Sequence, residues 1–149
     1  NFGDILAGYI SKKMGLNFRK LIIGTNENNI LDRTLKTGEH AVKDVISTSS
    51  PSIDIQISSN FERLIYDACK DSNVVSDLME NLKNKGSYKL SNEMREYIGT
   101  YFSSDTANKK EVEEALGLDA AGLSDVAKVL IGTNIISKIA INFEGPKYH

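Results

Sequence analysis

The first four residues of the sequence, Asn1-Phe2-Gly3-Asp4, have the composition and the position of a loop that binds a phosphate group. Apolar residues recur at helical spacing directly after them, so we expect a helix to begin here. The start of a helix presents unpaired backbone N–H groups and the positive end of the helix dipole, and a glycine lets an anion come close to the backbone. The alternative is a plain turn, with Asp4 as the N-cap of the helix.

Two other groups of polar residues are candidates for ligand binding. One follows an apolar run, at a strand exit where ligands of α/β proteins commonly bind, and consists of Glu27, Asn28, Asp32 and Arg33. The other lies at a predicted helix start and contains Asn60 and Arg63, because an arginine can form bidentate contacts with an anion. The alternatives are helix capping for the first group and a solvated arginine for the second.

Hydrophobic spacing predicts the elements that hold these residues. We expect a helix over residues 4–14, followed by a short strand over residues 20–25 that is buried on both faces. Thr25 or Asn26 can cap a second helix, which Gly38 closes. This alternation of helix and buried strand indicates an α/β fold.

The middle of the chain has weaker patterns. Isoleucines at positions 53, 55 and 57 alternate with polar residues, which favours a short extended segment. Ser59 and Glu62 have the spacing of a capping box and mark the clearest helix start in the chain. Further helical segments are expected from residue 74 to near Gly86, from Ser91 onward, over residues 106–116 and over residues 120–131.

The composition excludes several classes of function. With 149 residues and a formal net charge of −2, the chain lacks the excess of Lys and Arg found in nucleic-acid binders. It has no uninterrupted apolar run of about 18 residues. The single Cys69 rules out an internal disulfide and a cysteine-based zinc site, and it is typical of a reducing compartment. We therefore expect a cytoplasmic protein with no metal, no nucleic-acid partner and no membrane segment.

Three blocks of the sequence resemble successive parts of the threonine synthase family, which are pyridoxal-phosphate enzymes of the tryptophan-synthase β-like fold. The blocks are NFGDILAGYISKKMGL at residues 1–16, KLIIGTNENNILDR at residues 20–33 and SPSIDIQISSNFERLIYD at residues 50–67. The resemblance extends over about residues 1–102. It implies a three-layer α/β fold with a mostly parallel sheet and a helix-rich C-terminal part.

The resemblance also implies roles for the candidate residues. In the family, a loop that follows a glycine grips the phosphate of pyridoxal 5'-phosphate with backbone amides, and its counterpart here is Asn1, Phe2, Gly3 and Asp4. Asn60 and Arg63 are expected to face the phosphate of the substrate or to hold a domain interface. The implied cofactor is therefore pyridoxal 5'-phosphate, and the cofactor-binding residues come from the start of the chain.

The implied reaction converts O-phospho-homoserine and water into threonine and inorganic phosphate. The family's Schiff-base lysine lies upstream of the phosphate loop, in a segment that this sequence does not contain. Lys12, Lys13 and Lys20 occupy other positions in the pattern and are expected to be solvated. No catalytic residue is therefore assigned in this chain.

We expect residues 1–149 to form a single α/β piece of a larger enzyme. Residues 1–50 would contain the phosphate loop, a helix and the buried strand, and residues 51–116 a helical continuation. Residues 117–149 are expected to be a divergent tail, because the family's later histidine motifs are missing and the only histidines are His40 and His149.

The partners expected besides the small-molecule substrate are the missing part of the fold or a second copy of the chain. The alternative to an enzyme is a non-catalytic binding or interaction protein of the same ancestry.

Overall fold

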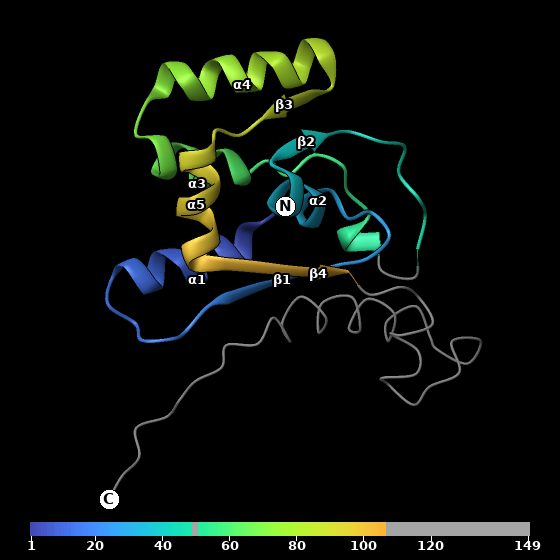
Figure 1. The fold of residues 1–149 in the computed structure, drawn as a ribbon. Coiled ribbons are helices and arrows are strands. Elements are labelled where there is room, and N and C mark those ends of the chain that lie inside the picture. The colour runs from blue at the N-terminus through green and yellow to red at the C-terminus, as the bar shows by residue number, and fades with distance from the viewer. Residues whose placement is uncertain (49–50, 107–149) are drawn as a thin grey trace, which may run out of the picture.

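The computed structural model describes residues 1–48 and 51–106 (Figure 1). The helices expected over residues 106–116 and 120–131 lie almost wholly outside this range, as does His149. The elements of the described part, in chain order, are α1 (Gly3–Lys13), β1 (Leu21–Thr25), α2 (Ile30–Thr37), β2 (Glu39–Ala41), the 3-10 turn η1 (Pro51–Ile53), α3 (Phe61–Cys69), α4 (Ser72–Lys85), β3 (Ser87–Lys89), α5 (Asn92–Tyr101) and β4 (Phe102–Thr106).

The described strands form two small sheets. Strands β1 and β4 pair in parallel from Leu21 opposite Phe102 to Thr25 opposite Thr106, and helices connect them through the intervening chain. Strands β2 and β3 pair antiparallel, with His40 opposite Tyr88. Helix α4 lies beside β3 and farthest from the β1–β4 pair (Figure 1). The expected α/β fold with a parallel sheet is confirmed.

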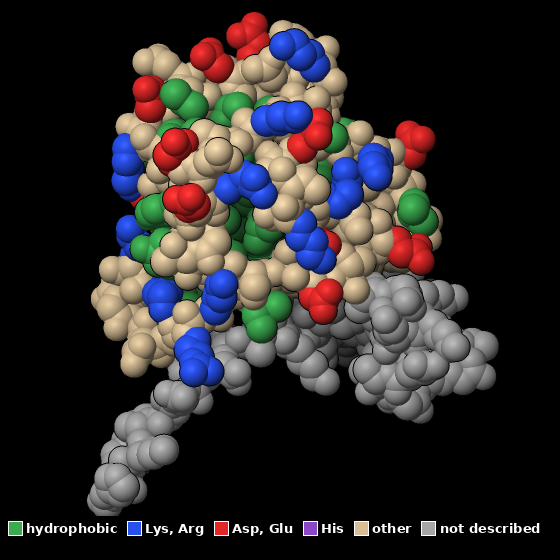
Figure 2. Space-filling model, viewed as in Figure 1, with side chains coloured by type: hydrophobic (Ala, Val, Ile, Leu, Met, Phe, Trp, Pro, Cys, Tyr) green, Lys and Arg blue, Asp and Glu red, His purple; other side chains and the backbone are tan. Residues whose placement is uncertain are grey.

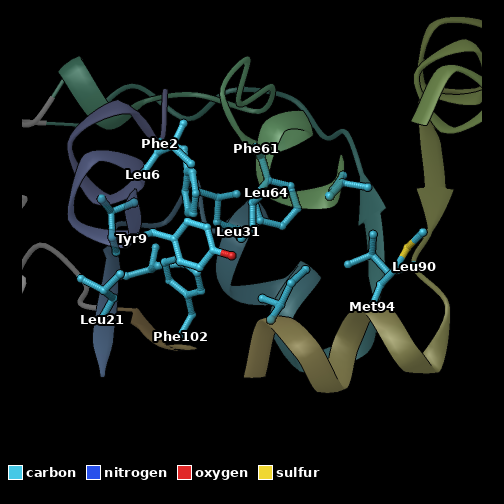
Figure 3. Close-up of a cluster of buried hydrophobic side chains, with 14 of the residues drawn as sticks. Phe2, Leu6, Tyr9, Leu21, Leu31, Phe61, Leu64, Leu90, Met94 and Phe102 are labelled. Atoms are coloured by element: carbon cyan, nitrogen blue, oxygen red, sulfur yellow. The ribbon is translucent and has the colours of Figure 1, made fainter. Parts of the chain in front are cut away.

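Aromatic rings join the start of the chain to the core (Figure 3). The ring of Phe2 packs edge-on against Phe61 with 5.2 Å between centroids, and it lies 5.5 Å from Phe102. The ring of Tyr9, about two helical turns further along α1, lies 5.6 Å from the same Phe102 ring. Burial of these rings fixes α1 against both α3 and β4, since each large aromatic side chain removes a large apolar area from water.

Helix ends in the described part follow the local signals of the sequence. Gly38 ends α2 in the left-handed conformation with φ of 79°, and Gly86 ends α4 with φ of 71°. A Cβ at Gly38 would also lie 2.5 Å from the Cδ of Arg95, so a side chain there would displace the arginine. At the start of α5, the side chain of its N-cap residue Ser91 accepts a hydrogen bond from the backbone N–H of Met94.

Some of the expected boundaries were wrong. Helix α2 begins at Ile30, with Asn29 as its N-cap, instead of after Thr25 or Asn26. Strand β1 is buried on one face only, because Ile22 on its other face is 37% exposed.

The segment around η1 also differs from its expectation. Residues 53–57 form no strand, and their alternation is reversed, because Gln56 is buried while Ile57 is exposed. The capping box was wrong as well, since Asn60 rather than Ser59 is the N-cap of α3. Thr106, placed at the start of a helix, ends strand β4. Strands β2, β3 and β4 were not predicted.

The structure places His40 in the core, on strand β2. Its ring is 1% exposed, stacks 4.7 Å from the Tyr88 ring, and lies 3.0 Å from the Thr34 hydroxyl through Nδ1. Burial, with a smaller contribution from the positive charge of Arg33, lowers the pKa of His40 to about 4. The folded protein therefore holds this histidine neutral.

We predict that the free energy of unfolding falls by about 2 kcal/mol between pH 7 and pH 5 through His40 alone. The unfolded chain takes up a proton near the ordinary histidine pKa of about 6.5, whereas the folded chain resists protonation until near pH 4, so stability is lost as the pH falls through this window. Urea unfolding followed by circular dichroism at both pH values measures the change. The His40→Asn variant should lose this part of the pH dependence, and an identical slope in that variant would contradict the assignment.

Candidate anion-binding site at the start of α1

A cavity of about 270 Å³ lies at the N-terminal end of α1, beside the end of β1 and the turn η1. Small polar residues, glycines and apolar residues from these elements and from the start of α2 line it. They are Asn1, Phe2, Gly3, Asp4, Ile5, Ile23, Gly24, Thr25, Asn28, Ile30, Leu31, Ser52, Ile53 and Ile55. All four residues of the predicted phosphate loop thus line one cavity. The end of a parallel strand and the start of a helix meet there, which is the usual place for a ligand in α/β proteins.

The residues of the first turn of α1 line this cavity, and their N–H groups lack acceptors within the helix. Helix α1 has no side-chain cap, and its first internal hydrogen bond runs from the N–H of Leu6 to the carbonyl of Phe2 at 3.1 Å. The N–H groups of Gly3, Asp4 and Ile5 consequently have no acceptor within the helix. Together with the helix dipole they can bind an anion.

Phe2 itself produces this geometry. Its backbone is left-handed, with φ of 64° and ψ of 10°, which is uncommon for a residue with a side chain. The buried ring holds it there. The alternative in which Asp4 is the N-cap is wrong, because Phe2 occupies that position and Asp4 lies inside the first turn.

Asn60 and Arg63 lie beside the loop and do not line the cavity. The backbone N–H and the side-chain Nδ2 of Asn60 both donate to the carbonyl of Asn1, at 3.3 and 2.9 Å. Arg63 donates to the Oδ1 of Asn60 and is otherwise exposed. In this structure the pair therefore connects the start of α3 to the loop.

Of the four polar residues predicted as a ligand-binding group after β1, one lines the cavity and the others lie outside it. Asn28 lines the cavity, whereas Glu27, Asp32 and Arg33 do not. Asp32 is buried and pairs with Lys36 at 2.9 Å; burial would raise the pKa of Asp32, but hydrogen bonds from Lys36, Ser104 and Thr106 outweigh it and lower that pKa. Arg33 donates to the carbonyl of Ala41 and to Gln56, so it joins α2 to the chain on either side of η1.

A network around Asp54 holds the wall of the cavity, and sequence reasoning missed it. Asp54 Oδ1 accepts from the side-chain amides of Asn26 at 2.7 Å and Asn28 at 2.9 Å. Its Oδ2 accepts from the backbone N–H of Thr48 at 2.8 Å. The amide Oδ1 of Asn28 accepts from the backbone N–H of Ile46 at 2.8 Å. The only local signal was a run of asparagines after a strand, which indicates a turn but not its distant partner.

Two other classes of site are absent from the described residues. Across residues 1–48 and 51–106, His, Cys, Asp and Glu side chains do not gather in a group of three or more that could hold a metal ion. None of the helices in that part of the chain is long and apolar enough to cross a membrane.

Comparison with known proteins identifies the family. The chain is 42% identical over 127 residues to threonine synthase of Saccharomyces cerevisiae, a match that covers 78% of the chain and 25% of the relative. It is 44% identical over 97 residues to threonine synthase of Corynebacterium glutamicum, covering 62% of the chain and 20% of the relative. No protein-family model matches.

Solved structures agree with the sequence matches. The crystal structure of PLP-bound threonine synthase from Brucella melitensis superposes with a TM-score of 0.78 at 41% identity, over 94% of the chain and 31% of that structure. The yeast threonine synthase structure gives a TM-score of 0.74 at 35% identity, over 92% and 31%.

The fold and the site define an α/β protein with a helix N-terminus open to an anion. The chain belongs to the threonine synthase family. It spans about a quarter of the length of the curated relatives it matches and about a third of the solved structures.

We predict that Asp54→Ala lowers the free energy of unfolding by about 2 to 4 kcal/mol. The substitution leaves two side-chain amides and one backbone N–H without their shared acceptor, and each unmet buried donor costs roughly 1–3 kcal/mol before the chain relaxes. Urea unfolding measures the loss. The matched control is Asp44→Ala, which removes an exposed carboxylate and should change stability by less than about 0.5 kcal/mol. Equal effects of the two substitutions would contradict a structural role for the network.

Proposed function

We propose that this chain supplies the phosphate-binding part of a pyridoxal-phosphate-dependent threonine synthase. The observation that carries the proposal is the set of free N–H groups of Gly3, Asp4 and Ile5 on the cavity at the start of α1. The PLP-bound relative from Brucella melitensis, which superposes over nearly the whole chain, supports the choice of ligand.

The residues present are compatible with this cofactor. A dianionic phosphate complements three backbone donors at the positive end of a helix dipole. The remaining wall is largely apolar, with Ile5, Ile23 and Ile30 among its residues, and accepts the uncharged part of an aromatic ligand. Gly3 is exposed. A Cβ at this position would contact only the Nδ2 of Asn60, at an ordinary 3.6 Å, so there is space around Gly3 for a ligand.

For the complete protein we propose conversion of O-phospho-homoserine and water into threonine and phosphate. When bound, pyridoxal phosphate supplies an electron sink for carbanions. The role of this chain is to hold the cofactor phosphate and to exclude water from one side of it with the apolar wall. Asn60 and Arg63 are proposed to lie near the phosphate of the substrate, because Arg63 is an exposed cation beside the loop.

The lysine that carries the cofactor is not assigned to this chain. Lys12, Lys13 and Lys20 do not line the cavity. Lys12 donates to the carbonyl of Phe18, and Lys13 lies 3.6 Å from Asp67. We propose that the reactive lysine comes from a part of the complete protein beyond these residues. From the sequence alone we propose a cytosolic location, and as partner either the missing part of the fold or a second copy of the chain. Nothing observed supports the non-catalytic alternative.

Borohydride reduction of the complete gene product in the presence of pyridoxal phosphate tests the enzymatic proposal. We expect a stable pyridoxyl-lysine adduct, detected by intact mass and located by peptide mapping outside residues 1–149. Absence of any adduct, with the protein folded, would favour the non-catalytic alternative.

We predict that Gly3→Glu weakens pyridoxal phosphate binding at least about tenfold, because it adds a negative charge where the phosphate would bind. Folding should be unaffected, since a carboxylate in the first turn of a helix is favourable. The matched control is Met14→Glu, which adds the same charge at a residue that is 83% exposed and beyond the other end of α1. Titration with pyridoxal phosphate and with pyridoxal measures the effect. A Gly3→Glu protein that binds both ligands like the control would contradict the phosphate site.

A further inference from the structure

A second polar cluster lies at the opposite end of α1 from the cavity. It joins three helices through Tyr9 and Lys13 of α1, Asp67 of α3 and Tyr97 of α5. The two tyrosine hydroxyls lie 2.7 Å apart, and both are hydrogen-bonded to Asp67 Oδ2, from Tyr97 at 2.8 Å. Lys13 Nζ donates to the Tyr97 hydroxyl at 3.2 Å and lies 3.6 Å from Asp67 Oδ2. Lys13 is exposed, as expected, and its ammonium group also contacts this cluster.

Asp67 and Tyr9 each keep one protonation state in this cluster. Burial alone would raise the pKa of Asp67, but hydrogen bonds from Lys70, Tyr9 and Tyr97 outweigh it and hold that pKa well below its usual range. Burial and the neighbouring carboxylate raise the pKa of Tyr9 far above its usual range. Asp67 therefore stays ionised and Tyr9 stays a donor throughout the pH range in which proteins work.

Beyond Tyr9, no residue of α1 belongs to the buried apolar core of the described part of the chain. The buried residues of this helix are Ile5, Leu6 and Tyr9, and beyond them Ile10 is 50% exposed and Met14 is 83% exposed. In the described part of the chain, the contacts that fix this half of the helix to α3 and α5 are those of the polar cluster and of the Tyr9 and Tyr101 rings, which pack edge-on at 5.0 Å.

Helix α3 is consequently joined at one point to the loop before α1 and at a second point to α1 itself. At its start, Asn60 donates to the carbonyl of Asn1. Near its end, two residues before Cys69, Asp67 accepts a hydrogen bond from Tyr9. The two points on α3 are seven residues apart, or about 10 Å along a helix. Two contacts separated by this distance restrict the angle between the two helices and therefore the direction of α1.

We propose that Asp67, together with Tyr9 and Tyr97, forms a positioning cluster that fixes the direction of α1 and thereby aims the N–H groups of Gly3 and Asp4 at the cofactor phosphate. This inference rests on the proposed function. None of the three residues lines the cavity, so they act only through the helix.

The test compares two variants of the complete gene product with a matched control. Asp67→Asn and Tyr97→Phe weaken the cluster while keeping its volume. The control, Lys70→Asn, removes the exposed partner of Asp67 and leaves the contacts to α1 intact; asparagine tolerates the left-handed backbone of this residue. We expect both variants to bind pyridoxal phosphate about tenfold more weakly than the control, with unchanged affinity for pyridoxal, which lacks the phosphate.

Hydrogen exchange without any cofactor provides the second readout. If the cluster positions α1, exchange in both variants should rise for the backbone N–H groups of residues 6–13 and stay unchanged in α2. A uniform rise throughout the fold would mean general destabilisation and would overturn the inference.

The outcomes separate the two proposals. If the unmodified protein prefers pyridoxal phosphate to pyridoxal and the variants keep that preference, the positioning inference is wrong and the phosphate site stands. If the unmodified protein shows no such preference, the phosphate site itself is wrong and the positioning inference falls with it.

Discussion

The arrangement of Phe2 determines the rest of the site. Its ring is held between Phe61 and Phe102, and this burial keeps the backbone in a left-handed conformation that a residue with a side chain seldom adopts. The chain therefore enters α1 without a side-chain cap, and the first N–H groups of the helix stay free on the cavity. An anion site made of backbone donors requires no cluster of cationic side chains. Basic and acidic side chains are accordingly interspersed over the face shown in Figure 2, in keeping with a net charge of −2.

Features decided by neighbours in the sequence could be predicted. Gly38 and Gly86 end their helices because glycine alone enters the left-handed region without a steric cost, and Ser91 begins α5 because its hydroxyl reaches a backbone N–H three residues away. The start of α1 belongs to this group too, since a glycine beside a helix start is visible in four consecutive residues. The role of these residues as a cofactor-phosphate loop stays a prediction that rests on the family resemblance, because the same local pattern also suits a plain turn.

Features decided by distant partners could not be predicted. Asp54 and Gln56 alternate with isoleucines as they would in a strand, but Asn26, Asn28 and Arg33 provide partners that draw the polar side chains inward and leave Ile57 exposed. Strand β4 was missed for a related reason. Phe102 to Thr106 is short and polar, and it becomes a strand only because β1 lies beside it.

The pairing of β1 with β4 has a consequence for how the chain folds during synthesis. Thr25 and Asp105, which meet through a hydrogen bond, are 80 residues apart in the sequence, whereas the contacts of α2 with β2 and of α4 with β3 form between neighbours. Closing so long a segment in parallel costs more chain entropy than forming these local pairs, so the β1–β4 pair is expected to form late. While the ribosome synthesises the intervening helices, the apolar run Leu21-Ile22-Ile23 does not yet have β4 beside it. The growing chain thus exposes a ready edge for wrong pairing, and it is during this interval that a chaperone would have most effect.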